Sequence, residues 1–181
     1  MNWLDRLCER RLDGQHSDER QNEQVQEPSL SERMQVGANL SQWLQGMFET
    51  GWQAIADLLG PEPDLAFSFR REDEAEPFIQ RVKRIQLSAE LPSVMLVVRL
   101  ETTADDRRQI WVQVLPWQGS AYLPAGLSLV LLSVSGEVIQ SVRAGSQSNY
   151  IQLRRFKCAL GTQFRLQIAV ADASVTEDFV V

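Results

Sequence analysis

Residues 94–100 read Val-Met-Leu-Val-Val-Arg-Leu, so that Val94, Leu96, Val98 and Leu100 share one face of an extended chain. Side chains alternate between the two faces of a β-strand, so this spacing predicts a strand with one face against a core. The two-residue period starts near residue 64 and recurs to the C-terminus. It predicts strands at Leu65–Phe69, Ile79–Leu87, Val94–Leu100, Ile110–Leu115, Leu127–Val134, Glu137–Val142, Tyr150–Leu153, Phe164–Val170 and Val175–Val180.

About eight or nine short strands, separated by turn residues, are typical of a β-sandwich or barrel. Helix-length runs between the strands are absent, which argues against a parallel α/β sheet. We therefore predict a mainly β fold over residues 64–181, an antiparallel β-sandwich of Ig-like or jelly-roll-like type.

Residues 39–60 follow a helical period instead. Apolar side chains recur there every three or four residues, at Leu40, Trp43, Leu44, Met47, Phe48, Ile55, Leu58 and Leu59. Asn39 is a good N-cap, and Gln42 three residues later completes a variant of the capping box. Gly46 and Gly51 each cost about 1 kcal/mol relative to Ala inside a helix, which is tolerable if another element packs there. The pattern predicts one amphipathic helix packed against the β-domain.

The acidic charge lies in the N-terminal third of the chain. Residues 1–63 carry 5 Lys+Arg against 11 Asp+Glu, whereas residues 64–181 carry 13 of each, so the net charge of −6 belongs to the first part. The composition of residues 1–38 predicts an acidic, largely flexible tail. For residues 3–12, a short helix and a frayed terminus are the alternatives. Nucleic-acid binding needs clustered positive charge and is not expected. No run of apolar residues is long enough for a signal sequence or a membrane span, so we expect a cytoplasmic protein.

Residues for catalysis or metal binding are scarce. The single histidine, His16, lies in the polar N-terminal segment, so no base is positioned for a Ser-His-Asp or Cys-His arrangement. Cys8 and Cys158 do not make a zinc site or a disulfide framework. We expect no cofactor, no metal and no enzyme activity. A carboxylate pair, for example Glu177 with a distant Asp, remains an alternative.

An aromatic loop, residues 116–124, is the first candidate binding surface. It holds Trp117 and Tyr122 between two prolines, and aromatic side chains on rigid loops are typical anchors for protein partners or sugar rings. In the alternative interpretation, the two rings cap one end of the core.

Two basic groups are the second candidate. One is Arg81, Lys83 and Arg84, and the other is Arg154, Arg155 and Lys157. If the groups were adjacent they would attract phosphates or an acidic partner segment. The alternative, which we favour, is that they protect strand edges or faces exposed to solvent. Cys158 follows the second group, where it is either activated by the cations or, more commonly, a small buried side chain.

Four segments carry a family resemblance, namely Leu40-Ser41-Gln42-Trp43-Leu44-Gln45-Gly46, Tyr122-Leu123-Pro124, Asn149-Tyr150-Ile151-Gln152-Leu153 and Ser174-Val175-Thr176-Glu177-Asp178-Phe179. In this order they resemble a family of uncharacterised cyanobacterial proteins, domain of unknown function 1822, over about residues 39–181. The resemblance implies no activity and no site residues. The predicted function is a non-catalytic protein-interaction or regulatory accessory module. The alternatives are a carbohydrate- or small-ligand-binding sandwich and an enzyme with an unrecognised carboxylate site.

Overall fold

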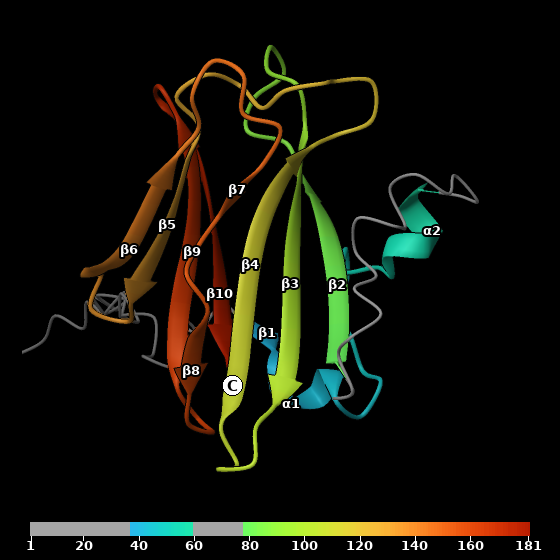
Figure 1. Ribbon diagram of the computed structural model, residues 1–181, viewed down its shortest axis with the longest axis vertical. Helices are drawn as coiled ribbons and strands as arrows, with labels where there is room; N and C mark the ends of the chain where they lie inside the picture. The colour runs from blue at the N-terminus through green and yellow to red at the C-terminus, as the bar shows by residue number, and fades with distance from the viewer. Residues whose placement is uncertain (1–36, 60–77) are drawn as a thin grey trace, which may run out of the picture. The chain divides into compact units, whose positions relative to one another are not determined.

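The computed structural model describes residues 37–59 and 78–181, so the predicted tail, its short helix and the strand at 65–69 lie outside the described residues. Within the described part, the chain forms two β-sheets that face each other, with very little helix (Figure 1). All strand pairs are antiparallel except one short parallel pair. The mainly β prediction is confirmed at this level.

One sheet, here called the β3 sheet, has the strand order β2-β3-β4-β7, with β8 pairing β4 beyond β7. Its strands are β2 (Phe78–Ile85), β3 (Val94–Thr102), β4 (Arg108–Pro116), β7 (Ile151–Gln152) and β8 (Phe156–Cys158). The other, the β9 sheet, has the order β1-β10-β9-β5-β6. Its strands are β1 (Ala38–Asn39), β5 (Ser128–Ser133), β6 (Val138–Arg143), β9 (Gln163–Val170) and β10 (Ala173–Val180).

The main core lies between the two sheets. Side chains at alternate positions of facing strands are fully buried in it, among them Leu96, Val98, Leu100, Leu129, Leu166 and Ile168. Burying a Leu or Ile side chain completely contributes about 1.5–3 kcal/mol, so these layers dominate the stability of the fold. The alternation seen in the sequence is the consequence of this one-sided burial.

The outer face of the β3 sheet carries a second, smaller core, here called the outer core. Val82, Met95 and Val97 are buried there, and partly buried Ile55, Leu58, Leu115 and Trp117 pack against them. Strand β3 is therefore covered on both faces, which explains why it is almost continuously apolar.

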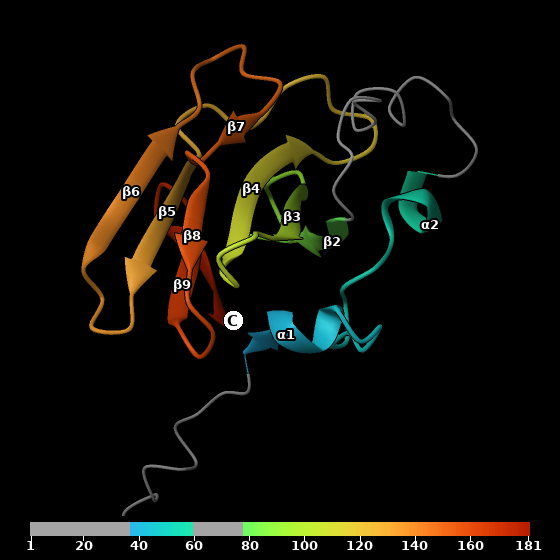
Figure 2. The same ribbon diagram turned by 60° about the horizontal axis from the view of Figure 1, so that its bottom comes forward.

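The prediction of a single helix over residues 39–60 is wrong. The structure has α1 (Leu40–Trp43) and α2 (Ile55–Leu59), separated by turns (Figure 2). Gly46 and Gly51 have φ values of 79° and 92°, a left-handed conformation that interrupts a right-handed helix. Beyond them, Gln53 pairs with Val82 at the edge of β2 through backbone hydrogen bonds of 2.9 and 3.0 Å. Gly46 and Gly51 are therefore turn residues and do not lie inside a helix.

The N-cap of α1 is confirmed, but its reciprocal partner differs. Asn39 Oδ1 accepts hydrogen bonds from the backbone N–H groups of Ser41 (3.1 Å) and Gln42 (3.3 Å). The Asn39 N–H donates to Glu49 Oε1 over 2.5 Å, so Glu49 takes the place predicted for the Gln42 side chain. The other oxygen of Glu49 accepts from Trp43 Nε1 over 2.8 Å. One carboxylate thus fixes the returning chain to the first turn of α1.

Two short strands, β1 and β8, have no counterpart in the predicted set, and ten strands are found in the described residues against about eight or nine expected. Two or three residues are too few to show a period. Ala38 and Asn39 pair in parallel with Phe179 and Val180, a contact that depends on the folded C-terminus.

Candidate functional site

Three loops meet at one end of the two sheets, and we call residues 86–93, 117–127 and 144–150 the loop end (Figure 1). Backbone hydrogen bonds join them. Trp117 N–H donates to Ser93 O over 3.3 Å, and Leu123 N–H donates to Ser148 O over 2.8 Å. These contacts fix loops that come from distant parts of the sequence.

The loop between β4 and β5 is also held where it enters β5. Gly126 N–H donates to Ala144 O (3.0 Å), and Arg143 Nε donates to Gly126 O (3.1 Å). Gly126 has a φ of 80°, and a Cβ atom there would meet Arg143 Nη2 at 3.1 Å. The conformation and the close approach both favour glycine.

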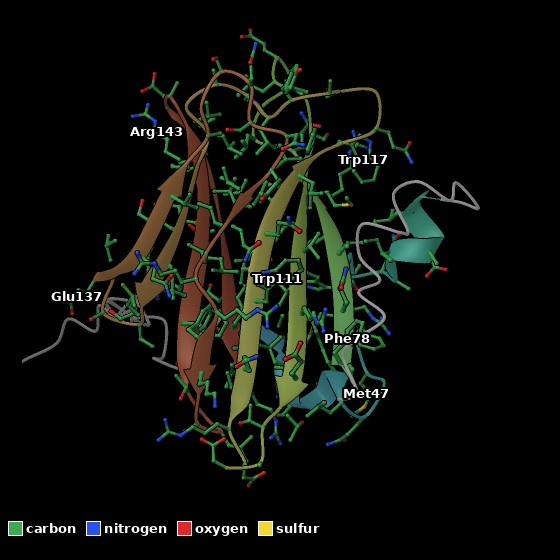
Figure 3. The ribbon with its side chains drawn as sticks, viewed as in Figure 1. Met47, Phe78, Trp111, Trp117, Glu137 and Arg143 are labelled. Atoms are coloured by element: carbon green, nitrogen blue, oxygen red, sulfur yellow. The ribbon has the colours of Figure 1, made fainter. Side chains whose placement is uncertain are left out.

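The predicted aromatic loop separates its two rings. Trp117 is half-buried against the outer core, with the Arg84 guanidinium 5.1 Å from its ring centre. The neighbouring Gln118 donates from Nε2 to Leu58 O over 2.8 Å, which ties this part of the loop to α2. In Figure 3, Trp117 lies on the β2 side of the molecule, towards α2. The Trp117 ring therefore packs mainly against the outer core and projects little into solvent.

Tyr122 remains exposed, and the structure adds a second tyrosine that sequence reasoning did not select. Tyr122 and Tyr150 each have 51 % of their surface exposed. The Leu123–Ser148 hydrogen bond brings their loops together, so both tyrosines belong to the loop end. In the sequence, Tyr150 is marked only as an aromatic residue directly after the polar run 145–149. Nothing in the sequence indicates that this run lies close to Tyr122.

The basic residues Arg154, Arg155 and Lys157 lie at the outer edge of the β3 sheet, and all three are exposed. Register places Gln152 opposite Gln113 and Phe156 opposite Ile110, so residues 153–155 stand opposite only two residues of β4. Such an extra residue is a β-bulge, which redirects the side chains it carries. The Gln140 side chain holds the bulge by accepting from Arg154 N (3.0 Å) and donating to Arg154 O (3.3 Å).

This basic edge is separate from the loop end. Ile151, next to Tyr150, pairs with Val114, whereas Lys157 pairs with Gln109. Five residues along β4 correspond to about 17 Å. The two candidate surfaces therefore form distinct regions.

The other basic group lies on β2 and makes contacts within the chain. The Arg81 guanidinium stacks 3.8 Å from the Phe48 ring centre, and desolvation lowers the pKa of Arg81 against the opposing effect of the Asp57 carboxylate. Lys83 Nζ lies 2.7 Å from both carboxylate oxygens of Glu177 on β10, which ties the two sheets together. Since β3 and β4 lie between β2 and β8, the two basic groups do not form one patch.

A cavity of about 380 Å³ lies beside the Lys83–Glu177 ion pair. Its lining is mostly polar and includes Glu49, Trp52, Lys83, Glu177 and Asp178. Glu49 binds the α1 cap, Glu177 binds Lys83, and Asp178 Oδ1 accepts from Arg165 Nε over 2.8 Å. The carboxylates of this cavity, including the Glu177 considered for catalysis, thus have partners within the chain.

The described residues bring together no group of three His, Cys, Asp or Glu side chains suited to a metal ion. Cys158 is a free, buried thiol, and burial raises its pKa above the ordinary value of 9.0. A raised pKa lowers the thiolate fraction and hence the reactivity. The buried alternative for Cys158 is confirmed. In the described part of the chain, the helices are too short to cross a bilayer.

Comparison with known proteins gives one match. The family model described as "Protein of unknown function (DUF1822)" matches residues 9–180. No curated protein and no solved structure matches the chain. The matched region begins well before Asn39, where the resemblance seen in the sequence starts, so residues 9–38 are part of the family pattern. Because the match covers most of the chain, this protein belongs to the DUF1822 family of proteins of unknown function.

Proposed function

We propose that this chain is a non-catalytic protein-binding module, an accessory or regulatory component that contacts its partner through the loop end. The observation that carries the proposal is the 2.8 Å hydrogen bond from Leu123 N–H to Ser148 O, which places two half-exposed tyrosines on loops joined to each other. Tyr side chains supply a large contact area at a low cost in conformational entropy, and a rigid loop lowers that cost further.

In the same proposal, a second and separate surface, formed by Arg154, Arg155 and Lys157, acts through its charge. Their exposure at a bulged edge supports a steering role for an acidic partner. Such a contribution weakens with salt, whereas contacts of the tyrosines do not.

We also propose that the two facing sheets form a β-sandwich of Ig-like or jelly-roll-like type. In the same proposal, the module acts in the cytoplasm. The core shared by β3, β4, β5, β9 and β10 supports the sandwich.

The test is affinity purification from native lysate with the full chain. Wild type should recover a protein in stoichiometric amount, and the double variant Tyr122→Ala/Tyr150→Ala should lose it by at least about tenfold. Leu160→Ala is the matched control, since Leu160 is 52 % exposed in the turn between β8 and β9 and lies outside the loop end. Equal recovery by the double variant would overturn the proposed surface. Glycan binding that disappears with Trp117→Ala, together with no protein partner, would support the carbohydrate alternative instead.

A further inference from the structure

The outer face of the β3 sheet becomes polar beside the outer core. Residues directly opposite each other on paired strands share a face, so Trp111 and Gln113 of β4 lie on the same face as Arg99 and Val97 of β3. Lys157 of β8 pairs with Gln109 and extends this face to the sheet edge. Val97 is buried in the outer core, whereas its neighbours towards β8 are polar or aromatic. We call Arg99, Glu101, Gln109, Trp111, Gln113 and Lys157 the polar face.

Two buried atoms of the polar face form no hydrogen bond in the described part of the chain. They are the donor Trp111 Nε1 and the acceptor Gln113 Oε1, and solvent reaches neither. Gln113 as a whole is only 8 % exposed. Folded proteins rarely bury polar atoms without a partner, because the loss of hydration is then uncompensated. Trp111 therefore lacks an acceptor, and Gln113 lacks a donor.

The spacing of this donor and this acceptor matches an extended peptide. Trp111 and Gln113 are two residues apart on β4, which corresponds to about 6.8 Å along the strand. Figure 3 shows Trp111 near the middle of β4. The main-chain groups of an extended peptide recur on one side with the same two-residue repeat. A peptide lying along β4 can therefore accept from Trp111 through a carbonyl and donate to Gln113 through the N–H two residues on.

The bulge at the sheet edge flanks Trp111 with cations. Residue 153 bonds to residue 112 and residue 156 pairs with residue 110, so Arg154 and Arg155 both stand opposite Trp111. Lys157 follows on the polar face, and all three cations are exposed. Arginine clusters of this kind bind carboxylates through charge-assisted hydrogen bonds.

The charge of the polar face favours an anionic ligand. Its carboxylate, Glu101, is engaged within the sheet, with Oε1 2.7 Å from Arg99 Nε. Desolvation lowers the pKa of Arg99, the Glu101 carboxylate opposes this change, and the charge of Arg155 adds to it. Arg155 is therefore close enough to Arg99 for the two guanidinium groups to repel each other. A carboxylate placed between them relieves this repulsion.

We propose that the polar face binds an extended acidic segment of a partner protein, which lies along β4 with its main chain on Trp111 and Gln113 and its carboxylates among Arg154, Arg155 and Lys157. This assignment rests on the proposed protein-binding function and names the partner of its basic surface. Access to the two buried atoms requires rotation of neighbouring side chains. Arg154 and Arg155 are exposed opposite Trp111, and they turn towards the incoming carboxylates.

The first test is isothermal titration calorimetry of the full chain with a capped peptide of alternating Glu and Ser as long as β4, 9 residues. Wild type should bind this peptide with a Kd of about 0.1 mM or tighter, and more weakly as NaCl is raised. A peptide of alternating Gln and Ser should bind at least about tenfold more weakly. Trp111→Phe keeps an aromatic ring but removes the donor, and it should weaken binding of the acidic peptide about fivefold.

The second test separates binding from folding. Gln113→Met replaces a buried acceptor that has no partner with an apolar side chain of similar length. Its Tm should therefore equal or exceed that of wild type, while binding of the acidic peptide weakens about fivefold. A purely structural role of Gln113 would lower both. Gln167→Met is the matched control, since Gln167 lies on β9 in the other sheet and should leave peptide binding unchanged.

The proposal is overturned if wild type does not bind the acidic peptide, or if Trp111→Phe and Gln113→Met bind it as wild type does. Tighter binding of an oligothymidylate than of the peptide would also overturn it, in favour of nucleic acid. In the lysate purification, loss of the partner with Tyr122→Ala/Tyr150→Ala but full recovery with Gln113→Met would overturn the polar face and leave the loop end standing. Peptide binding that depends on Gln113, in a chain that recovers no partner through its tyrosines, would support the polar face and overturn the loop end.

Discussion

Removal of the Glu49 carboxylate is the change with the clearest expected cost. Glu49 accepts from the Asn39 N–H over 2.5 Å and from Trp43 Nε1 over 2.8 Å, and Trp43 is fully buried. Hydrogen bonds to charged groups contribute about 1.5–3 kcal/mol each, and a buried donor left without a partner costs about 1–3 kcal/mol. The site is partly buried, so we take the lower end for each bond. Glu49→Ala should then lower the free energy of unfolding by about 3 kcal/mol.

Glu49→Gln should cost less, about 2 kcal/mol, because the amide keeps one acceptor oxygen but turns an NH₂ group towards the second donor. For a chain of this size, 1 kcal/mol corresponds to about 2–4 °C in Tm, so Glu49→Ala should melt roughly 6–12 °C below wild type. Urea unfolding followed by tryptophan fluorescence gives the free energy, with an unchanged m-value as the sign that only stability has changed.

Two comparisons make the measurement specific. Glu90→Ala, on an exposed loop, should change stability by less than about 0.5 kcal/mol. Trp43→Phe removes the indole donor, and its cost should shrink in the Glu49→Ala background because the bond is already lost. If Glu49→Ala is as stable as Glu90→Ala, or if the two costs simply add, Glu49 does not fix the chain to α1 as described.

Three further changes test other contacts. Gly37→Ala should destabilise the protein, because a Cβ atom there collides with the Asp178 backbone and separates β1 from β10. Gly145→Ala is the control and should fold normally, since only Ser148 Oγ lies near its Cβ position, at 3.7 Å. Equal melting temperatures of the two variants would contradict this prediction. Lys83→Met removes the cation that pairs with Glu177, whose side chain is only 17 % exposed. The free energy of unfolding in urea should fall by about 1–3 kcal/mol, and Glu177→Gln in the same chain should reduce this loss. In a Cys8→Ser chain, Cys158 should react with alkylating reagents only as fast as the fold opens. Since burial raises the pKa of this thiol, the stability present at neutral pH should fall as pH rises above 9.0, and Cys158→Ala should flatten that fall; rapid labelling of the native chain would refute the buried assignment.

The strands were predictable because burial on one side of a sheet imposes a period on the sequence. Strands β2, β4, β5, β6, β9 and β10 all lie where alternation indicated them, with ends that differ by a few residues. Strand β3 was identified by the same pattern, although Met95 and Val97 are also buried. Periodicity cannot distinguish one covered face from two when the strand itself is short.

The helix prediction failed because an apolar period does not require a continuous face. Leu44 and Met47, placed on the apolar side of the predicted helix, are 38 % and 49 % exposed. Trp43 and Trp52 do meet, with ring centres 4.9 Å apart, but across a turn. Their contact is set by the left-handed glycines and by Glu49, and neither effect is visible as a period.

The loop end was only half predictable for a related reason. The sequence indicated Trp117 and Tyr122 as a pair, but Trp117 packs against the outer core whereas Tyr122 remains exposed. Tyr150 joins Tyr122 through a hydrogen bond between Leu123 and Ser148, two residues that are distant in the sequence. Local sequence rules carry no information about such a pairing.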